Sequence, residues 1–369
     1  MDEPAGEVRD DRRQSETVLG VFPAQPRSRR PQPQRTLYGA LDLGTNNCRL
    51  LIARPAAQGF RVVDAFSRIV RLGQGLTSGG RISPAAMQRT LSALEVCAAK
   101  LQRRGVTRLR AVATEACRRA ENGRDFLEAA RVRSGLELEV IDAEEEASLA
   151  LYGCAPLLDR SKRHAAIIDI GGGSTEIVWL SHDTEASEAA QLPDSPRVRA
   201  WHSVPLGVVD LAERFGGHEV GRSTYDAMVA EVMAEMRPFV ERYGLPEWAS
   251  RGALQMIGTS GTVTTLTGVH MELPRYDRTR VDGAYLSLEL VGRLSEQVRA
   301  MGYRARVAHP CIGRDRADLV VAGCAILEAF WRLCPAEGLT VADRGLREGL
   351  LYLMMREDGA WSAQADTGP

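Results

Sequence analysis

The 369-residue chain has little lysine, few aromatic residues and no long apolar run. Lys100 and Lys162 are its only lysines, so arginine carries nearly all of the positive charge, and arginine grips phosphate groups in a bidentate manner. No stretch of 18 apolar residues exists, so no membrane-spanning helix is expected. The seven cysteines are scattered without a Cys-x-x-Cys pair. This pattern argues against a disulfide framework or a zinc site and favours a reducing cytoplasm.

Two common nucleotide-binding signatures are also missing. The chain has no Gly-x-x-x-x-Gly-Lys-Ser/Thr sequence, so it is not a P-loop protein, and it has no Gly-x-Gly-x-x-Gly either. The stretch "LGQGLTSGG" at 72–80 has the wrong spacing. A net charge of −1 gives no overall field that would attract nucleic acid. We therefore expect neither a nucleic-acid nor a membrane partner.

The ends of the chain differ in composition from its body. Residues 1–36 are polar and proline-rich ("PAQPRSRRPQPQR") and lack the apolar core of a signal peptide, so we expect a disordered basic arm. Residues 357–369 are expected to form a flexible tail. The length and the 44% hydrophobic content suffice for two globular domains, which we expect at 37–150 and 151–356.

The stretch "AAIIDIGGGSTEIVWL", at 165–180, combines an apolar strand, an acid, three glycines and a second apolar strand. Glycines let backbone N–H groups approach a ligand without an intervening Cβ atom. A turn of such donors beside Asp169 suits a phosphate group with its metal ion. The alternative is an ordinary tight hairpin with an Asp-Gly turn.

The same device occurs earlier, in "YGALDLGTNNCRLLIAR" at 38–54. The two segments align without gaps, and a separation of 127 positions is too long for a repeat array, so it indicates a duplicated domain. Two such halves suggest a ligand clamped between them. The aligned pairs are Asp42 with Asp169, Gly44 with Gly171, Asn47 with Ser174, and Arg49 with Glu176.

A third turn follows in "LQMIGTSGTVTTLTGV" at 254–269, where Gly258 to Thr262 separate a strand from an amphipathic helix. A loop at a helix N-terminus is a ready anion site. Further helices are predicted from Pro84, with Ser83 as the N-cap and Gly105 as the stop, and after Asp142. Others are expected near 223–242, 287–301, 316–333 and 344–356, and 182–198 reads as a loop within a hairpin. Strands that precede helices, twice over, predict two α/β domains of RNase H-like type.

Three phosphate turns in this order resemble the layout of the actin, sugar-kinase and chaperone-ATPase superfold. Within it, residues 37–355 closely resemble the exopolyphosphatase and guanosine pentaphosphate phosphohydrolase family. The resemblance implies an α/β fold with two RNase H-like domains and an active-site cleft between them, in the family's short two-domain form. The segments that carry it are "DLGTNNCRLLIA", "RLGQGL…ISPAAMQRTLSAL", "AVATEACRRAENGRDFLEAA", "IDAEEEASLALYG", "DIGGGSTEIV", "VPLGVVDL", "IGTSGT" and "RADLVVAGCAILEAF…DRGLREGLLY".

The resemblance also implies roles for individual residues. Glu146 falls where the family has its catalytic base, and Arg118 matches an arginine that holds phosphate. The implied cofactor is Mg²⁺, held by Asp42 and by Asp169 or Glu176. Without the resemblance, Glu144 to Glu146 would read as acids that favour a helix start. The residues expected to bind substrate phosphate are Gly44, Thr45, Asn46, Asn47, Gly171, Gly172, Gly173, Ser174, Gly258, Ser260 and Gly261.

The implied activity is the Mg²⁺-dependent release of terminal phosphate from inorganic polyphosphate. The alternative substrate is guanosine pentaphosphate, which would make the protein a phosphohydrolase of the stringent response. A kinase or a nucleotide-dependent clamp of the same superfold is the remaining alternative. The sequence leaves a homodimer open.

Overall fold

A computed structural model describes residues 36–57, 59–182 and 197–360. The expected basic arm, most of the expected hairpin loop and the last nine residues lie outside this part. The strands form two sheets, of order β3-β2-β1-β4-β5 and β10-β11-β9-β6-β7-β8. The strands are β1 Tyr38–Leu43, β2 Asn47–Pro55, β3 Phe60–Ile69, β4 Arg108–Ala113, β5 Glu139–Val140, β6 His164–Ile170, β7 Thr175–Ser181, β8 Arg197–Val204, β9 Leu254–Thr259, β10 Tyr285–Ser287 and β11 Gly338–Ala342.

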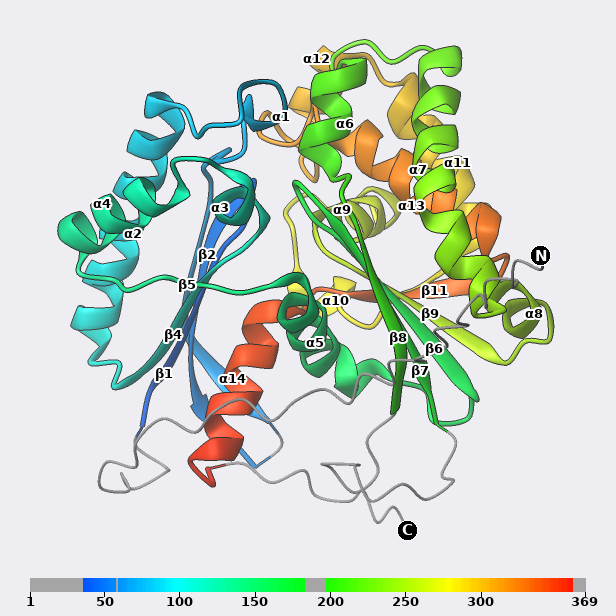
Figure 1. Cartoon of the computed structure of the whole chain (residues 1–369). Coiled ribbons are helices and arrows are strands. Elements are labelled where there is room, and N and C mark those ends of the chain that lie inside the picture. The colour runs from blue at the N-terminus through cyan, green and yellow to red at the C-terminus, as the bar shows by residue number, and fades with distance from the viewer. Residues whose placement is uncertain (1–35, 58, 183–196, 361–369) are drawn as a thin grey trace, which may run out of the picture.

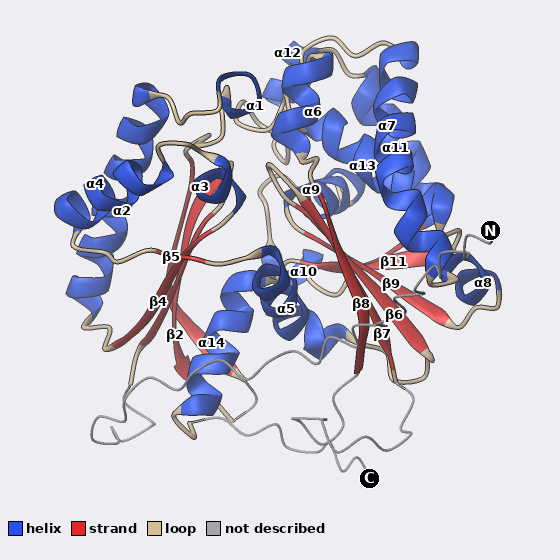
Figure 2. Ribbon diagram, in the orientation of Figure 1, coloured by secondary structure: helices blue, strands red, loops and turns tan. Residues whose placement is uncertain are grey.

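Helices cover both sheets (Figures 1 and 2). None of the described helices is long and apolar enough to cross a membrane. The helices are α1 Leu76–Gly79, α2 Pro84–Arg104, α3 Glu115–Arg119, α4 Gly123–Ser134, α5 Ala143–Cys154, α6 Val208–Phe215, α7 Arg222–Arg242, α8 Leu245–Ser250, α9 Gly261–His270, α10 Arg278–Val281, α11 Leu288–Ala300, α12 Tyr303–Ala308, α13 Val320–Leu333 and α14 Leu346–Glu357.

The two sheets share one topology over five strands, and the second sheet has β10 as an additional edge strand. In each, a three-stranded antiparallel meander continues through its first strand into parallel strands, β1 into β4 and β5, and β6 into β9 and β11. The hairpins match residue for residue, because Asp42 pairs with Arg49 and Asp169 with Glu176. The backbone of each turn is closed by an equivalent hydrogen bond of 2.9 Å, from Gly44 N–H to Asn47 O and from Gly171 N–H to Ser174 O. The duplication predicted from the sequence is therefore confirmed.

Helices and sheets alternate across the molecule. One face of the first sheet forms a core with α2 and α4, and one face of the second forms a core with α7, α9, α11 and α13. The facing sides of the two sheets are filled by α14, which packs against β1 and β2, and by α5, which packs against β6 and β7. In Figure 1 these two helices lie side by side at the centre of the molecule.

The C-terminal helix α14 differs from the expected domain boundaries. We expected 151–356 to belong to the second domain, yet Leu350 and Met354 are buried against Tyr38 and Ala40 of the first sheet. The expected tail also begins too early, because Glu357 ends α14. Asp358 then accepts hydrogen bonds from Tyr38 Oη at 3.0 Å and Arg108 Nε at 2.9 Å. The chain thus passes from the first half to the second after α5 and returns just before α14.

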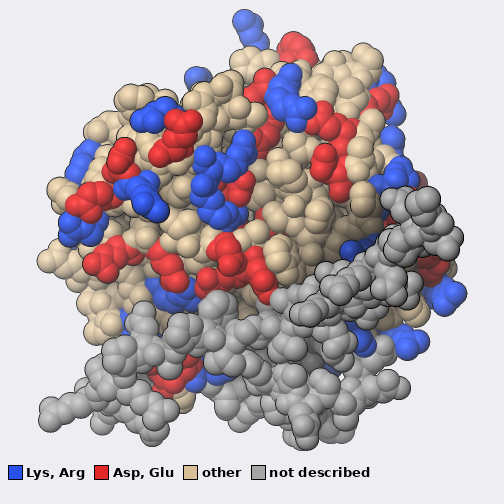
Figure 3. All heavy atoms as spheres, viewed as in Figure 1, with Lys and Arg blue, Asp and Glu red and all other residues tan. Residues whose placement is uncertain are grey.

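The helix starts and stops follow local sequence signals. The side chain of Ser83 accepts a hydrogen bond from Ala86 N–H, Pro84 is the first residue of α2, and Gly105 ends it with φ = 67°. Asp142 caps α5 by accepting from Glu145 N–H at 2.8 Å. On the molecular face drawn in Figure 3, acidic and basic side chains are interspersed, in keeping with the small net charge.

Candidate active site

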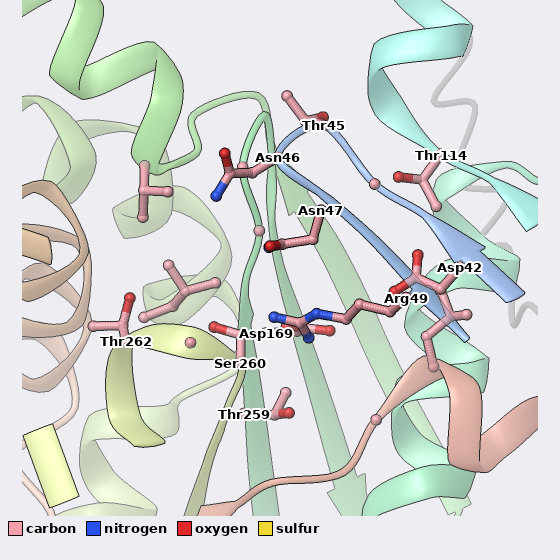
Figure 4. Close-up of a pocket in the computed structure, with 18 of the residues that line it drawn as sticks. Asp42, Thr45, Asn46, Asn47, Arg49, Thr114, Asp169, Thr259, Ser260 and Thr262 are labelled. Carbon is pink, nitrogen blue, oxygen red and sulfur yellow. The ribbon is translucent and has the colours of Figure 1, made fainter. Parts of the chain in front are cut away.

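A cavity of about 150 Å³ lies between the two sheets, where the hairpin turns of the two halves meet. The turns touch: a Cβ atom on Gly172 would stand 3.0 Å from Thr45 Cβ, and one on Gly173 would stand 2.8 Å from Thr45 Oγ1. Close approach of the two turns therefore requires glycine on the second one. Figure 4 shows Thr45 and Asn46 at the tip of the first turn, beside the second.

Most of the predicted site residues line this cavity. Glu146 reaches it from the first turn of α5, whereas Glu144 and Glu145 do not line it. Glu145 instead accepts a hydrogen bond from Arg110 at 2.8 Å, on another side of the helix. The other predicted residues in the lining are Asp42, Gly44, Thr45, Asn46, Asn47, Asp169, Gly171, Gly172, Gly173, Ser174, Ser260 and Gly261.

Three predicted residues lie behind the lining. Gly258 is within β9, and a Cβ atom there would stand 2.7 Å from Val263 Cγ1, so packing explains this glycine. Glu176 is only 2% exposed and accepts a hydrogen bond from Ser203 Oγ at 2.9 Å. The third is Arg118, which contacts Glu146 instead of the cavity.

Arg118 is held by three acceptors on neighbouring segments. Its Nη1 donates to Ile141 O at 2.7 Å and to Glu146 Oε2 at 2.9 Å, and its Nε and Nη2 donate to Glu115 Oε2 at 3.1 and 2.8 Å. Its side chain is 18% exposed. The guanidinium therefore holds Oε2 of Glu146, a residue that lines the cavity.

Three of the carboxyl groups that line the cavity, those of Asp42, Asp169 and Glu146, have raised pKa values. Burial raises the pKa of Asp42, and burial followed by the nearby charge of Asp42 raises that of Asp169 to about 6. Burial, and then the charge of Glu176, raises the pKa of Glu146 well above its usual value. A carboxyl group with a raised pKa is a stronger base when ionised, which suits a residue that takes a proton.

Several residues that line the cavity were not expected from the sequence. Arg49 is the cross-strand partner of Asp42, and in Figure 4 it extends from β2 toward Asp169. Its position in the aligned hairpins, opposite Glu176, could have revealed it. Arg316, in contrast, was expected: the sequence suggested the arginines of the stretch 275–316 as contacts for a long phosphate chain, and Arg316 is the one of them that lies in the lining. The remaining charged residues missed are Glu115, Asp343, Arg344, Arg347 and Glu348, the last four from the segment "DRGLREG" that carried the resemblance.

Comparison with known proteins identifies the family to which this architecture belongs. A model of the Ppx/GppA phosphatase family matches residues 51–358. The chain belongs to this family. It is 31% identical, over 317 residues, to a guanosine-5'-triphosphate,3'-diphosphate pyrophosphatase of Aeromonas salmonicida. That match covers 86% of this chain and 59% of the relative, so the chain spans less than two thirds of the relative's length.

Solved structures of Ppx/GppA relatives share the fold. The crystal structure of an exopolyphosphatase from Cytophaga hutchinsonii has a TM-score of 0.75 at 26% identity, covering 89% of this chain and all of that one. The Aquifex aeolicus family member has a TM-score of 0.67 at 27% identity, covering 87% and 98%. The predicted family and the predicted two-domain actin-like fold are thereby confirmed.

Proposed function

We propose that the protein is an exopolyphosphatase that releases the terminal phosphate of inorganic polyphosphate. The observation that carries this proposal is the composition of the cavity lining. Among its described residues are two acid-bearing turns, four further carboxylates and four arginines, but no aromatic ring on which a guanine base could stack. A chain of phosphates needs charge neutralisation and backbone donors, which this lining provides, whereas a nucleoside also needs a surface for its base.

In the proposed reaction, the N–H groups of the turns after Asp42 and Asp169 bind the oxygens of the terminal phosphate. Arg49 and Arg316 add positive charge, which lowers the repulsion between the phosphate and the surrounding acids. Glu146 takes a proton from a water molecule whose oxygen forms the new bond to phosphorus. The bond from phosphorus to the bridging oxygen breaks, and the shortened chain leaves with the electron pair. Arg118 acts through Glu146, as a positioning residue.

The proposed cofactor is Mg²⁺, held by Asp42 and Asp169. No group of three or more His, Cys, Asp and Glu side chains in the described part of the chain is arranged to hold a metal ion. Two carboxylates nevertheless fit Mg²⁺, which commonly binds one or two carboxylates together with substrate phosphates. Burial and then the charge of Asp42 raise the pKa of Asp169, and this favours the same assignment, because a cation would relieve the repulsion by Asp42. When bound, Mg²⁺ would neutralise charge on the phosphate oxygens. Glu176, hydrogen-bonded outside the lining, is left out of this site.

Guanosine pentaphosphate is the second candidate substrate, and the name of the Aeromonas relative favours it. Both substrates end in a phosphoanhydride, so the chemistry at Glu146 would be the same. The deciding experiment measures phosphate release from both substrates side by side, with Mg²⁺ and after removal of metal with a chelator. We expect release from long polyphosphate to dominate and to depend on Mg²⁺. Faster release from guanosine pentaphosphate would overturn the first choice of substrate, and full activity in chelator would overturn the metal.

A further inference from the structure

Arg347 lines the cavity from the first turn of α14 and has no partner there. Its side chain makes no hydrogen bond or ion pair with any residue of the described part of the chain. The nearby Arg344 behaves differently, because its guanidinium is hydrogen-bonded to both carboxylate oxygens of Asp282. Arg347 is therefore a partly buried cation that no residue of the described part of the chain neutralises by direct contact.

Three acids lie near Arg347, namely Glu348, Asp42 and Asp343, and all but Asp42 are engaged by other groups. Glu348 accepts hydrogen bonds from Arg278 at 2.8 Å and from Gly345 N–H at 3.0 Å. Asp343 accepts one from Tyr276 Oη at 2.7 Å. These acids attract Arg347 through space, but burial and the neighbouring charge of Arg49 work against the cation and lower its pKa. A partly buried cation without a direct partner loses part of its hydration, which costs free energy on folding.

The position of Arg347 at the start of α14 also disfavours its positive charge. The N-terminus of a helix carries partial positive charge, so a cation in the first turn is repelled and an anion is favoured. Both the side chain and the helix end therefore attract an anion in the cavity. A bound anion would offset both effects, the lost hydration of the guanidinium and its repulsion by the helix end. We therefore look for the role of Arg347 in ligand binding.

We propose that Arg347 binds the terminal phosphate of the substrate and the orthophosphate released from it. This inference rests on the proposed function, because it assumes that the cavity takes a phosphate group. Phosphate would supply the acceptors that the guanidinium lacks and would place negative charge near the start of α14. Since α14 packs against the first sheet and follows directly on β11 of the second, the bound phosphate would be held by a helix tied to both halves.

The test compares stability and orthophosphate binding in the full chain with Mg²⁺ present. Arg347→Gln should raise the melting temperature of the ligand-free protein by about 2–4 °C, because an unpaired cation is removed. The same variant should weaken orthophosphate binding, measured by calorimetric titration, by about tenfold or more. Arg347→Lys keeps the charge, so it should show no gain in melting temperature and an intermediate affinity.

Two matched controls separate this effect from a general loss of arginine. Arg344→Gln leaves Asp282 without its cation and should lower the melting temperature. Arg356→Gln, at the other end of α14, should leave the affinity for orthophosphate within about twofold. A lower melting temperature or an unchanged affinity for Arg347→Gln would overturn the inference. Hydrolysis of polyphosphate by the unsubstituted protein is measured in parallel. If it is absent while the two effects persist, the proposed function fails and the anion site stands.

Discussion

At the scale of single residues, the structure distinguishes three adjacent acids that the local sequence pattern alone does not, although the family resemblance pointed to Glu146. Glu144, Glu145 and Glu146 all lie in the first turn of α5, where acids favour a helix start. Only Glu146 lines the cavity, while Glu145 is paired with Arg110. The sequence predicted the residue types and the turn positions because local backbone geometry sets them. It could not predict which side of the helix faces the other half of the molecule, because that depends on packing.

Glu146→Gln tests the proposed base. The glutamine keeps the size of the side chain but cannot accept the proton, so kcat should fall by about 10²–10⁴-fold. KM should stay close to unchanged, since the residue acts on water and not on the bound phosphate. Steady-state kinetics with polyphosphate checks both values. Glu144→Gln and Glu145→Gln serve as controls and should keep kcat within a small factor. If either control lost activity while Glu146→Gln stayed active, the base would be Glu144 or Glu145 instead.

Arg118→Gln tests whether this arginine acts through Glu146 or on phosphate. The charge and hydrogen bond of Arg118 lower the pKa of Glu146 against the raising effects of burial and Glu176. Removing the cation should therefore raise that pKa further. Glu146 is active when ionised, so the acidic limb of the pH profile of kcat should move to higher pH. A large rise in KM with an unmoved pH profile would instead show direct contact with phosphate.

At the scale of elements, the contact between α5 and α14 is closer than side chains allow. A Cβ atom on Gly153 would stand 2.0 Å from Gly345 O, and one on Gly349 would stand 2.0 Å from Leu149 O. The sequence predicted both helices, because their caps and apolar spacing are local signals. The expected boundaries grouped α14 with the second half, whereas α14 packs against the first sheet. The local sequence does not reveal this packing, because Gly349 contacts Leu149, 200 positions earlier in the chain.

Gly349→Ala tests this contact. Alanine favours a helix by about 1 kcal/mol over glycine, so a free helix would gain stability. Here the added methyl group must push the two helices apart, and we expect a net loss of about 1–3 kcal/mol in the free energy of unfolding. Denaturant unfolding measures it. Gly79→Ala is the control, because a Cβ atom there would meet nothing within 4 Å and should be neutral or slightly stabilising. Equal stability of the two variants would contradict the close packing.

At the scale of the whole molecule, polar contacts hold the two halves together over the cavity. Arg71, which follows the first sheet's meander, donates two hydrogen bonds to Asp318, at 2.7 and 2.9 Å, before α13. Gly75 N–H donates to Glu213 at 2.8 Å, and Thr77 Oγ1 donates to Asp210 at 2.5 Å. These contacts join residues that lie far apart in the sequence, so no local sequence pattern predicts them. They indicate that the two halves are held in a closed arrangement beside the cavity.

Asp318→Asn tests the contribution of this closure. The Arg71–Asp318 pair is bidentate but partly exposed, with side-chain exposures of 30% and 17%, so we expect its loss to weaken closure by about 1 kcal/mol. The closed fraction of the ligand-free protein should fall, and the apparent affinity for polyphosphate should fall with it, by at most about fivefold. Small-angle scattering should show a larger radius of gyration that saturating polyphosphate restores. Asp226→Asn, which removes an exposed ion pair within α7, should change neither quantity. An unchanged radius and affinity for Asp318→Asn would mean that the turns and helices alone keep the halves closed.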